Sequence, residues 1–369
     1  MKKKVLSMLL CTVMVMSLAV GCGSSSDEKE ADTKEETTKE DAAEEEPVEA
    51  EAVDQRTVYV SPEWVKSVID GNQEGYENYV ICEVSYDDVD SSPDYNEGHL
   101  PGAIHVGDTE VEDATGSEEG AYNLLAAEEV EANLLSHGIT KDTKVILYGQ
   151  DPAGVGRVAY AYIWAGVEDV KILNGGIDAW NEAGYDLETE ANEREAAEDF
   201  GTTVPAHPEY WVSIEDAKDR LANDDNFKLV SIRSEAEWLG ETSGYNYMDK
   251  AGEPEGAVWG KGAQTAFDVA DFTNEDGTVK DLAGLKEVWA DCDFTLDNHL
   301  SFYCGTGWRA TVPFLVLYEN GYDDISVYDG GWYEWLMHDD YPVQVGDPAS
   351  DDCEHTTVGE LPTGMAAED

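Results

Sequence analysis

FYCGTGWRAT, residues 302–311, contains the most informative cysteine of this sequence. An apolar run ends at Tyr303, and Cys304 is followed by two glycines, a tryptophan and an arginine within five positions. The residues up to Gly321 are apolar enough for a packed helix. A short apolar strand, a Gly-rich turn and a helix together suit the binding of an anion or a thiolate. A free cysteine buried at a strand end is the alternative, because small thiols are common in protein cores.

The same succession of segments occurs earlier in the chain. The two copies keep the same order and lie about 150 to 155 residues apart, which indicates an internal repeat. The matching pairs are YVICEVS (79–85) with KLVSIRS (228–234), GHLPGA (98–103) with GEPEGA (252–257), VILYG (145–149) with LSFYC (300–304), and NGGIDAW (174–180) with DGGWYEW (329–335). Short apolar strands that alternate with helical segments predict a parallel sheet, covered on both faces, in each half.

This repeat resembles the two-domain rhodanese sulfurtransferases. The resemblance rests on GHLPGA in the first copy and on CGTGWR (304–309) at a strand end in the second, and it covers residues 56–345. It implies an α/β protein of two tandem rhodanese-like domains, each a five-stranded parallel sheet with helices on both faces. In that family usually only the C-terminal copy is catalytic. Gly149 stands where Cys304 stands in the second copy, so we expect the N-terminal copy to be inactive.

Composition and the repeat together divide the chain into five parts. The predicted parts are a lipoprotein signal peptide at 1–22, a disordered acidic tether at 23–55, an inactive rhodanese-like domain at 56–190, a catalytic rhodanese domain at 205–345 and an acidic C-terminal tail at 346–369. The tether contains no aromatic residue, so it cannot bury enough apolar surface to fold.

The N-terminus resembles a lipoprotein signal. Lys2, Lys3 and Lys4 precede a short apolar core, and small residues stand directly before Cys22. The resemblance implies lipidation of Cys22 as the first residue of the mature chain. A plain secretory signal is the alternative, and a spanning helix is disfavoured because the apolar run is short. We therefore expect an exported protein, held at the cell membrane by a lipid anchor only and facing the extracytoplasmic side.

Charge and cysteine content exclude several classes of function. The 369 residues carry a formal net charge of −59, which argues against binding to nucleic acid. The cysteines and histidines show no metal-ligand spacing, so neither a metal nor a cofactor is predicted. Besides Cys304, the expected fold holds Cys82, Cys292 and Cys353, and a disulfide between the last two is conceivable but left open. The sequence names no protein partner.

The loop around Cys304 offers what a reactive thiol needs, since only the thiolate attacks sulfur. Gly305 and Gly307 can adopt positive φ, so the loop can curl with its backbone N–H groups directed inward. The helix that follows adds its positive N-terminal end, and Arg309 adds a permanent positive charge. The expected substrate-binding residues of the loop are Gly305, Thr306, Gly307, Trp308 and Arg309. For Trp308, an exposed contact to a partner protein is the alternative.

The family resemblance implies a double displacement in which Cys304 is the catalytic residue. Cys304 takes the outer sulfur of thiosulfate as a persulfide, sulfite leaves, and cyanide or another thiol accepts the sulfur. A 3-mercaptopyruvate donor fits the same scheme. Phosphate or arsenate chemistry is less favoured, because the related enzymes resemble a Cys-x5-Arg pattern, whereas four residues separate Cys304 from Arg309 here. A surface binding or sensing module without turnover is the alternative from another class.

Arg233 is a further candidate for substrate binding. It resembles the arginine of an Asp-x-Arg pattern that faces the active-site pocket of many rhodaneses, although Ser231 replaces the aspartate here. The alternative is a salt bridge to Glu235 or Glu237.

The segment 240–262 is longer than its counterpart in the first copy and is a possible specificity loop. Tyr245 and Tyr247 are expected to line the cleft, and Lys261, like Lys250, to attract an anionic donor. The alternatives are packed tyrosines and ordinary surface lysines.

Overall fold

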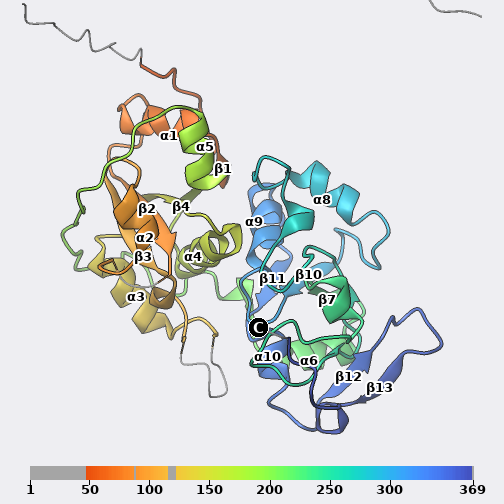
Figure 1. The fold of residues 1–369 in the computed structure, drawn as a ribbon. Helices are drawn as coiled ribbons and strands as arrows, with labels where there is room; N and C mark the ends of the chain where they lie inside the picture. Colours follow the sequence, from red (N-terminus) through yellow and green to blue (C-terminus); the bar gives the residue numbers. More distant parts are fainter. Residues whose placement is uncertain (1–46, 87–88, 115–121, 368–369) are drawn as a thin grey trace, which may run out of the picture. The chain divides into compact units, whose positions relative to one another are not determined.

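The computed structural model describes residues 47–86, 89–114 and 122–367 (Figure 1). The predicted signal peptide, Cys22 and the tether up to residue 46 lie outside these residues. In the part of the chain that is described, no helix combines the length and the apolarity that crossing a membrane requires.

The N-terminal repeat folds around a five-stranded parallel sheet. Its strands lie in the order β1 (Tyr59–Val60), β5 (Asp169–Leu173), β4 (Lys144–Tyr148), β2 (Tyr79–Ser85) and β3 (Ala103–Gly107). Its helices are α1 (Pro62–Ile69), α2 (Pro93–Glu97), α3 (Ala127–Ser136), α4 (Pro152–Ala165) and α5 (Gly176–Glu182). Successive strand residues point to opposite faces. Ile81 therefore packs with α1 and α5, and the next residue, Cys82, packs with α3 and α4.

The C-terminal repeat has the same architecture. Its parallel strands lie in the order β6 (Trp211–Val212), β11 (Ile325–Tyr328), β10 (His299–Tyr303), β7 (Phe227–Ser231) and β9 (Val258–Trp259). Its helices are α6 (Ile214–Asn223), α7 (Glu235–Trp238), α8 (Leu282–Val288), α9 (Thr311–Glu319) and α10 (Gly331–Trp335). Leu229 packs with α6 and α10, and Val230 packs with α8 and α9. The predicted fold class, two α/β repeats that each contain a five-stranded parallel sheet, is confirmed.

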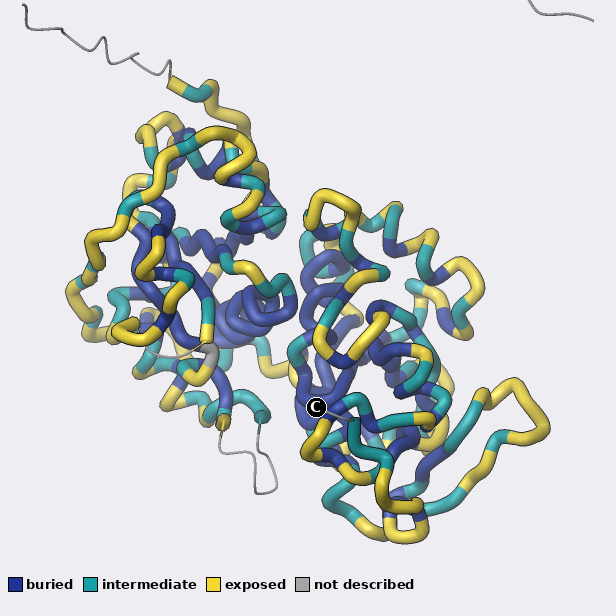
Figure 2. The backbone as a smooth tube through the Cα atoms, in the orientation of Figure 1, coloured by how far each residue is buried: buried dark blue, intermediate teal, exposed yellow. Residues whose placement is uncertain are grey.

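The two repeats share one apolar core. It runs from the first sheet through α4 and α9 to the second sheet, and both helices are buried on nearly every side (Figure 2). A Cβ atom on Gly156 would lie 2.7 Å from Oγ1 of Thr311, so the close approach of the two helices requires a glycine there. The N-terminal repeat thus packs directly on the repeat that carries Cys304.

A small third sheet, which the sequence analysis did not predict, joins the C-terminal repeat to the segment that follows it. It consists of β8 (Glu253–Pro254), β12 (Pro342–Val345) and β13 (Glu354–Thr357), paired antiparallel around β12. Farther along, the backbone N–H of Ala367 donates to the carbonyl of Tyr245 at 3.1 Å. Residues 346–367, which the sequence analysis assigned to an acidic tail, are therefore part of the folded domain. The buried Val358 and Leu361 hold the segment on the domain, although most of its residues are polar.

The fold also begins earlier than predicted. Gln73 donates to the carbonyl of Glu51 at 2.9 Å, and the ammonium of the buried Lys171 donates to the carbonyls of Asp54 and Gln55 at 3.1 and 2.9 Å. Buried polar groups need partners, and here the backbone of the acidic segment supplies them. Residues 51–55, which the sequence analysis assigned to the disordered tether, are therefore part of the N-terminal repeat.

Candidate active site

Cys304 follows strand β10 and opens a tight loop, residues 304–309, which we call the Cys304 loop. The thiol-bearing residue is 1% exposed. The start of α10 holds the loop from below, because Trp332 N donates to the Cys304 carbonyl at 2.9 Å and Tyr333 N to the Gly305 carbonyl at 3.0 Å. Gly307 has φ +87°, and a Cβ there would lie 2.7 Å from a carboxylate oxygen of Asp329. The loop therefore requires glycine at 307 for its curl.

A cavity of about 250 Å³ opens above Cys304. The Cys304 loop contributes Cys304, Thr306, Trp308 and Arg309; the C-terminal repeat adds Tyr245, Tyr247, Ala266 and Phe267; and the N-terminal repeat adds Tyr86, Glu112, Ala114, Tyr122, Asp151 and Ala153. Six of these lining residues are aromatic. Tyr86, Tyr247 and Phe267 are 57%, 46% and 77% exposed, so aromatic rings form the mouth of the cavity. The inactive repeat supplies one wall of the cavity.

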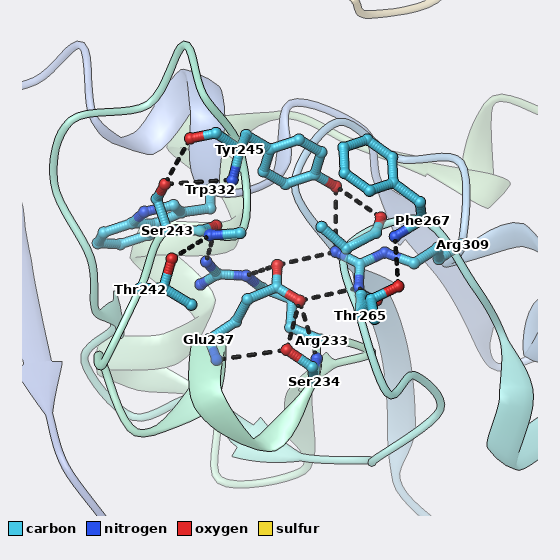
Figure 3. A network of polar contacts seen from close by, with 12 residues as sticks. Arg233, Ser234, Glu237, Thr242, Ser243, Tyr245, Thr265, Phe267, Arg309 and Trp332 are labelled. Atoms are coloured by element: carbon cyan, nitrogen blue, oxygen red, sulfur yellow. Dashed lines mark hydrogen bonds and ion pairs between the residues drawn. The ribbon is translucent and has the colours of Figure 1, made fainter. Parts of the chain in front are cut away.

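Arg309 is buried, and its guanidinium is largely occupied by the protein (Figure 3). It binds both carboxylate oxygens of Glu237 at 3.0 Å, the Thr265 carbonyl at 3.0 Å and the Tyr245 hydroxyl at 3.1 Å. Among the described residues its Nε–H has no hydrogen-bond partner. Arg309 therefore keeps one unpaired donor, its Nε–H, and its charge is balanced by Glu237. The sequence analysis expected Arg309 to bind substrate with its permanent positive charge.

Arg233 lies one layer behind the cavity and does not line it. Its guanidinium binds Glu237 at 3.1 Å and Glu253 at 2.7 Å, and it also binds the Gly252 and Ser243 carbonyls. Figure 3 shows Glu237 between Arg233 and Arg309. The expectation that Arg233 binds substrate is corrected: its donors are used in a buried ion-pair network, the alternative that the sequence also offered.

Glu237 is the centre of this network. Burial would raise the pKa of its carboxyl, but the adjacent Arg309 and Arg233 outweigh burial and lower the pKa to about 2. The Ser234 hydroxyl accepts from the backbone N–H of Glu237 at 3.4 Å, and the backbone N–H of Ser234 donates to the Glu237 carboxylate at 2.9 Å, which forms a capping box at the start of α7. Glu237 was not among the predicted site residues, although the Ser-x-x-Glu spacing of that box is visible in the sequence.

This pairing predicts a specific dependence of stability on pH. The ordinary pKa of a glutamate is 4.5 and that of Glu237 in the folded protein is about 2, so its ionised form stabilises the fold above pH 4.5. That stability is lost as the pH falls toward 2. We expect Glu237→Gln to lower the free energy of unfolding by about 3 kcal/mol at pH 7 and by progressively less below pH 4.5.

Urea titrations of wild type and Glu237→Gln between pH 7 and 2.5 measure this difference. Glu235→Gln is the matched control, because Glu235 is on the same short helix but exposed. A difference between Glu237→Gln and wild type that does not change with pH would contradict the ion-pair explanation.

The two lysines of the specificity loop do not reach the cavity. Lys261 pairs with Asp291 at 2.5 Å, and Lys250 donates to the Val358 carbonyl at 2.7 Å. The expectation that Lys261 attracts a donor at the site is therefore corrected. Tyr245 and Tyr247 do line the cavity. The inactive repeat was expected to form a wall of the cleft, but none of its individual lining residues was predicted; the position of Tyr86 directly after strand β2 was an available signal.

The N-terminal repeat has no room for a nucleophile at the equivalent position. A Cβ atom on Gly149 would lie 2.3 Å from the Val84 carbonyl oxygen and 2.9 Å from a methyl group of Val155. Cys82, Cys292, Cys304 and Cys353 are all free thiols, so the conceivable disulfide between Cys292 and Cys353 is not formed. Within the described part of the chain, no group of three or more potential ligands is placed to hold a metal ion.

Comparison with known proteins identifies the family. A family model described as "Rhodanese-like domain" matches residues 75–183 and 213–338. The chain belongs to the rhodanese family. The match falls on both repeats, and the predicted membership of the two-domain rhodanese family is thereby confirmed.

Two curated thiosulfate sulfurtransferases are similar to this chain. Thiosulfate sulfurtransferase YnjE of Escherichia coli is 40% identical over 254 residues, which are 69% of this chain and 57% of YnjE. This rhodanese therefore spans less than two thirds of the length of YnjE. Thiosulfate sulfurtransferase of Cricetulus griseus is 30% identical over 247 residues, 66% of this chain and 79% of that protein.

Solved structures show the same fold. The crystal structure of YnjE superposes with a TM-score of 0.73 at 36% identity, over 79% of this chain and 69% of that one. An anaerobic ergothioneine biosynthesis enzyme from Chlorobium limicola, in complex with its natural substrate trimethyl histidine, superposes with a TM-score of 0.72 at 34% identity, over 80% and 71% of the two chains.

Proposed function

We propose that this rhodanese transfers the sulfane sulfur of thiosulfate to a thiophilic acceptor through a persulfide on Cys304. The Cys304 thiolate attacks the outer sulfur of thiosulfate, the S–S bond breaks, and sulfite leaves with the bonding electron pair. An acceptor thiolate or cyanide then attacks the outer sulfur of the persulfide and releases Cys304 as a thiolate. No oxidant or reductant is consumed.

The observation that supports this scheme is a set of unpaired donors in the loop that begins with a buried thiol. Among the described residues, none accepts a hydrogen bond from the backbone N–H groups of residues 305–309. Four of these five residues are buried, as is Cys304, and the Arg309 Nε–H is also unpaired. Unpaired N–H groups in a protein interior are rare and costly. A persulfide anion on Cys304 would give these donors the negative charge that they lack in the free protein.

Intact mass spectrometry of residues 23–369 tests the proposal. After incubation with thiosulfate we expect the mass of one added sulfur atom, located on Cys304 by peptide mapping and removed by cyanide. An adduct formed from 3-mercaptopyruvate but not from thiosulfate would assign the other donor. A protein that takes up sulfur from neither donor would be a binding or sensing module.

A second candidate acceptor is a trimethylammonium-bearing imidazole, and the aromatic wall of the cavity favours it. Six aromatic residues and the carboxylates of Glu112 and Asp151 line the space above Cys304. Aromatic faces attract quaternary ammonium groups. Structures of the related EanB contain hercynine in one form and, in another, a cysteine persulfide with ergothioneine.

The persulfide form of this rhodanese can distinguish the acceptors directly. It is incubated separately with cyanide and with hercynine, and the products are identified by mass spectrometry. Ergothioneine as a product would support the second candidate. If only thiocyanate forms and hercynine is recovered unchanged, the result would contradict the second candidate and support a general thiophilic acceptor.

We also propose that lipidation of Cys22 holds this enzyme at the outer side of the cell membrane, where it would meet exported or external sulfur compounds. Cys22→Ala should move the protein from the membrane fraction to the soluble fraction or leave the signal uncleaved. A processed Cys22→Ala protein that stays in the membrane fraction would contradict the anchor.

A further inference from the structure

Arg157 of the inactive repeat is fully buried, and its side chain reaches the Cys304 loop of the other repeat. It lies on α4. Its Nε donates to Glu112 at 3.2 Å, its Nη2 donates to the Tyr122 carbonyl at 2.9 Å, and its Nη1 forms a short contact with Asp329 of the C-terminal repeat. Burial would lower the pKa of Arg157, but the carboxylates of Asp329 and Glu112 outweigh burial and raise it. Arg157 is therefore a charged tie between the repeats.

Both carboxylates that Arg157 binds also contact the Cys304 loop. Glu112 accepts a hydrogen bond from Nε1 of Trp308 at 2.5 Å. Asp329 lies against Gly307, where an added Cβ would be 2.7 Å from its Oδ1 and 3.1 Å from Nη1 of Arg157. One guanidinium thus supports two consecutive residues of the loop, the backbone of Gly307 and the indole of Trp308.

The N-terminal repeat fixes Trp308 at further points. The ring of Tyr86 stacks on the indole with centroids 5.7 Å apart and an interplanar angle of 13°. Gly154, one turn before Arg157, packs α4 closely against Trp308, because an added Cβ at this glycine would lie 3.2 Å from the indole. Asp329 is likewise held from the N-terminal repeat, by the backbone N–H of Leu124 at 2.6 Å. The loop conformation in the C-terminal repeat therefore depends on side chains of the repeat that has no nucleophile.

We propose that Arg157 is a positioning residue for the sulfur-transfer reaction: it holds Glu112 and Asp329 so that Trp308 and Gly307 keep the Cys304 loop curled around the thiol. The inactive repeat contributes to the reaction through this contact as well as through the cavity wall. The inference rests on the proposed chemistry of Cys304, although the geometry that it describes does not depend on the donor. A planar fork is needed because three acceptors in different directions are bound at once.

Arg157→Lys tests this inference with the charge retained. An ammonium cannot bind Glu112, the Tyr122 carbonyl and Asp329 together, so the loop should loosen. We expect persulfide formation from thiosulfate to slow on the order of tenfold in the folded variant, because small displacements of reacting groups are costly. The rate of Cys304 alkylation by iodoacetamide, followed by peptide mass spectrometry, should change as well.

Glu112→Ala is a second variant in case Arg157→Lys does not fold. It removes the acceptor of Trp308 and should reproduce the slower persulfide formation. The double variant should be no slower than the slower single one, because both changes break the same chain of contacts. Tyr160→Phe is the control. Tyr160 lies one turn farther along α4 and donates to the Tyr210 carbonyl at 2.8 Å, so its loss should lower the melting temperature and leave both rates unchanged.

Wild-type rates of alkylation and persulfide formation in folded Arg157→Lys would overturn the inference, as would wild-type rates in Glu112→Ala. A rate loss of the same size in Tyr160→Phe would show that Arg157 has no specific positioning role and only supports the contact between the repeats. Iodoacetamide needs no sulfur donor. An altered alkylation rate in a protein that never forms a persulfide would therefore refute the proposed function while the positioning role stands.

Discussion

Cys304→Ser is expected to abolish persulfide formation and to lower the rate of sulfur transfer by at least about three orders of magnitude. The reaction needs a sulfur atom that can carry a second sulfur, and a serine hydroxyl cannot form the covalent intermediate. The measurement is twofold: intact mass after thiosulfate, and the steady-state rate with cyanide as acceptor. The substitution is nearly isosteric at a buried position, so the melting temperature should change little.

The other described thiols provide matched controls for Cys304→Ser. Burial raises the pKa of Cys292 to about 11 and raises the pKa of Cys82 still further, so both stay protonated at neutral pH. Neither these two nor Cys353 lines the cavity. Cys82→Ser, Cys292→Ser and Cys353→Ser should therefore retain turnover. Persulfide formation that survives in Cys304→Ser, or that is lost in one of the controls, would move the chemistry to another residue.

Arg309→Ala is expected to have the second-largest effect, and it should act on stability and on rate. Removing one partner of a buried ion pair costs about 3–5 kcal/mol, because the remaining charge is left in the interior. Glu237 would keep Arg233 as a partner, which places the expected loss at the lower end of that range. Urea unfolding at pH 7 measures it.

The effect of Arg309→Ala on the reaction follows from the free Nε–H. Losing one preorganised donor beside a developing negative charge slows a reaction by about a hundredfold or more. We expect slower persulfide formation and slower alkylation of Cys304 by iodoacetamide. Arg309→Lys should also be impaired, since a single ammonium cannot replace both the two nitrogens that bind Glu237 and the further Nε–H donor.

Arg220→Ala is the control for a general loss of positive charge. Arg220 pairs with Asp224 on the surface at 3.2 Å, and such exposed pairs contribute little to stability. A folded Arg309→Ala protein with wild-type rates of persulfide formation and of Cys304 alkylation would show that Arg309 only supports the fold. The backbone N–H groups of the Cys304 loop would then have to stabilise the Cys304 persulfide anion.

Local patterns in the sequence predicted the fold and the nucleophile. The apolar runs 79–85, 145–148 and 300–303 became strands of parallel sheets, because each is long enough for a strand and apolar on both faces. Cys304 and the glycines of its loop were recognisable because a tight curl after a strand requires particular residues at adjacent positions. Periodicity, turn chemistry and repetition are all short-range properties, and one sequence displays them directly.

The charges of the site could not be predicted in the same way. Arg309 was expected to hold a donor anion, but Glu237, 72 residues away, neutralises it and leaves one N–H free. Arg233 and Lys261 were expected at the cavity. Lys261 is instead bound to Asp291, and Arg233 is bound to Glu253 as well as to Glu237, the partner that the sequence offered as the alternative. A chain with 81 acidic residues offers many partners for every cation, and only the packed structure selects one.

The contribution of the inactive repeat depended on the tertiary structure most of all. Arg157 and Asp329 are 172 residues apart in the chain, and nothing in the local sequence of either links them. They meet because α4 and α9 bury their apolar faces against each other, which brings Tyr86, Glu112 and Arg157 to the Cys304 loop. The nucleophile can be predicted from the residues next to it in the chain, whereas the groups that surround it are brought there by the burial of two helices.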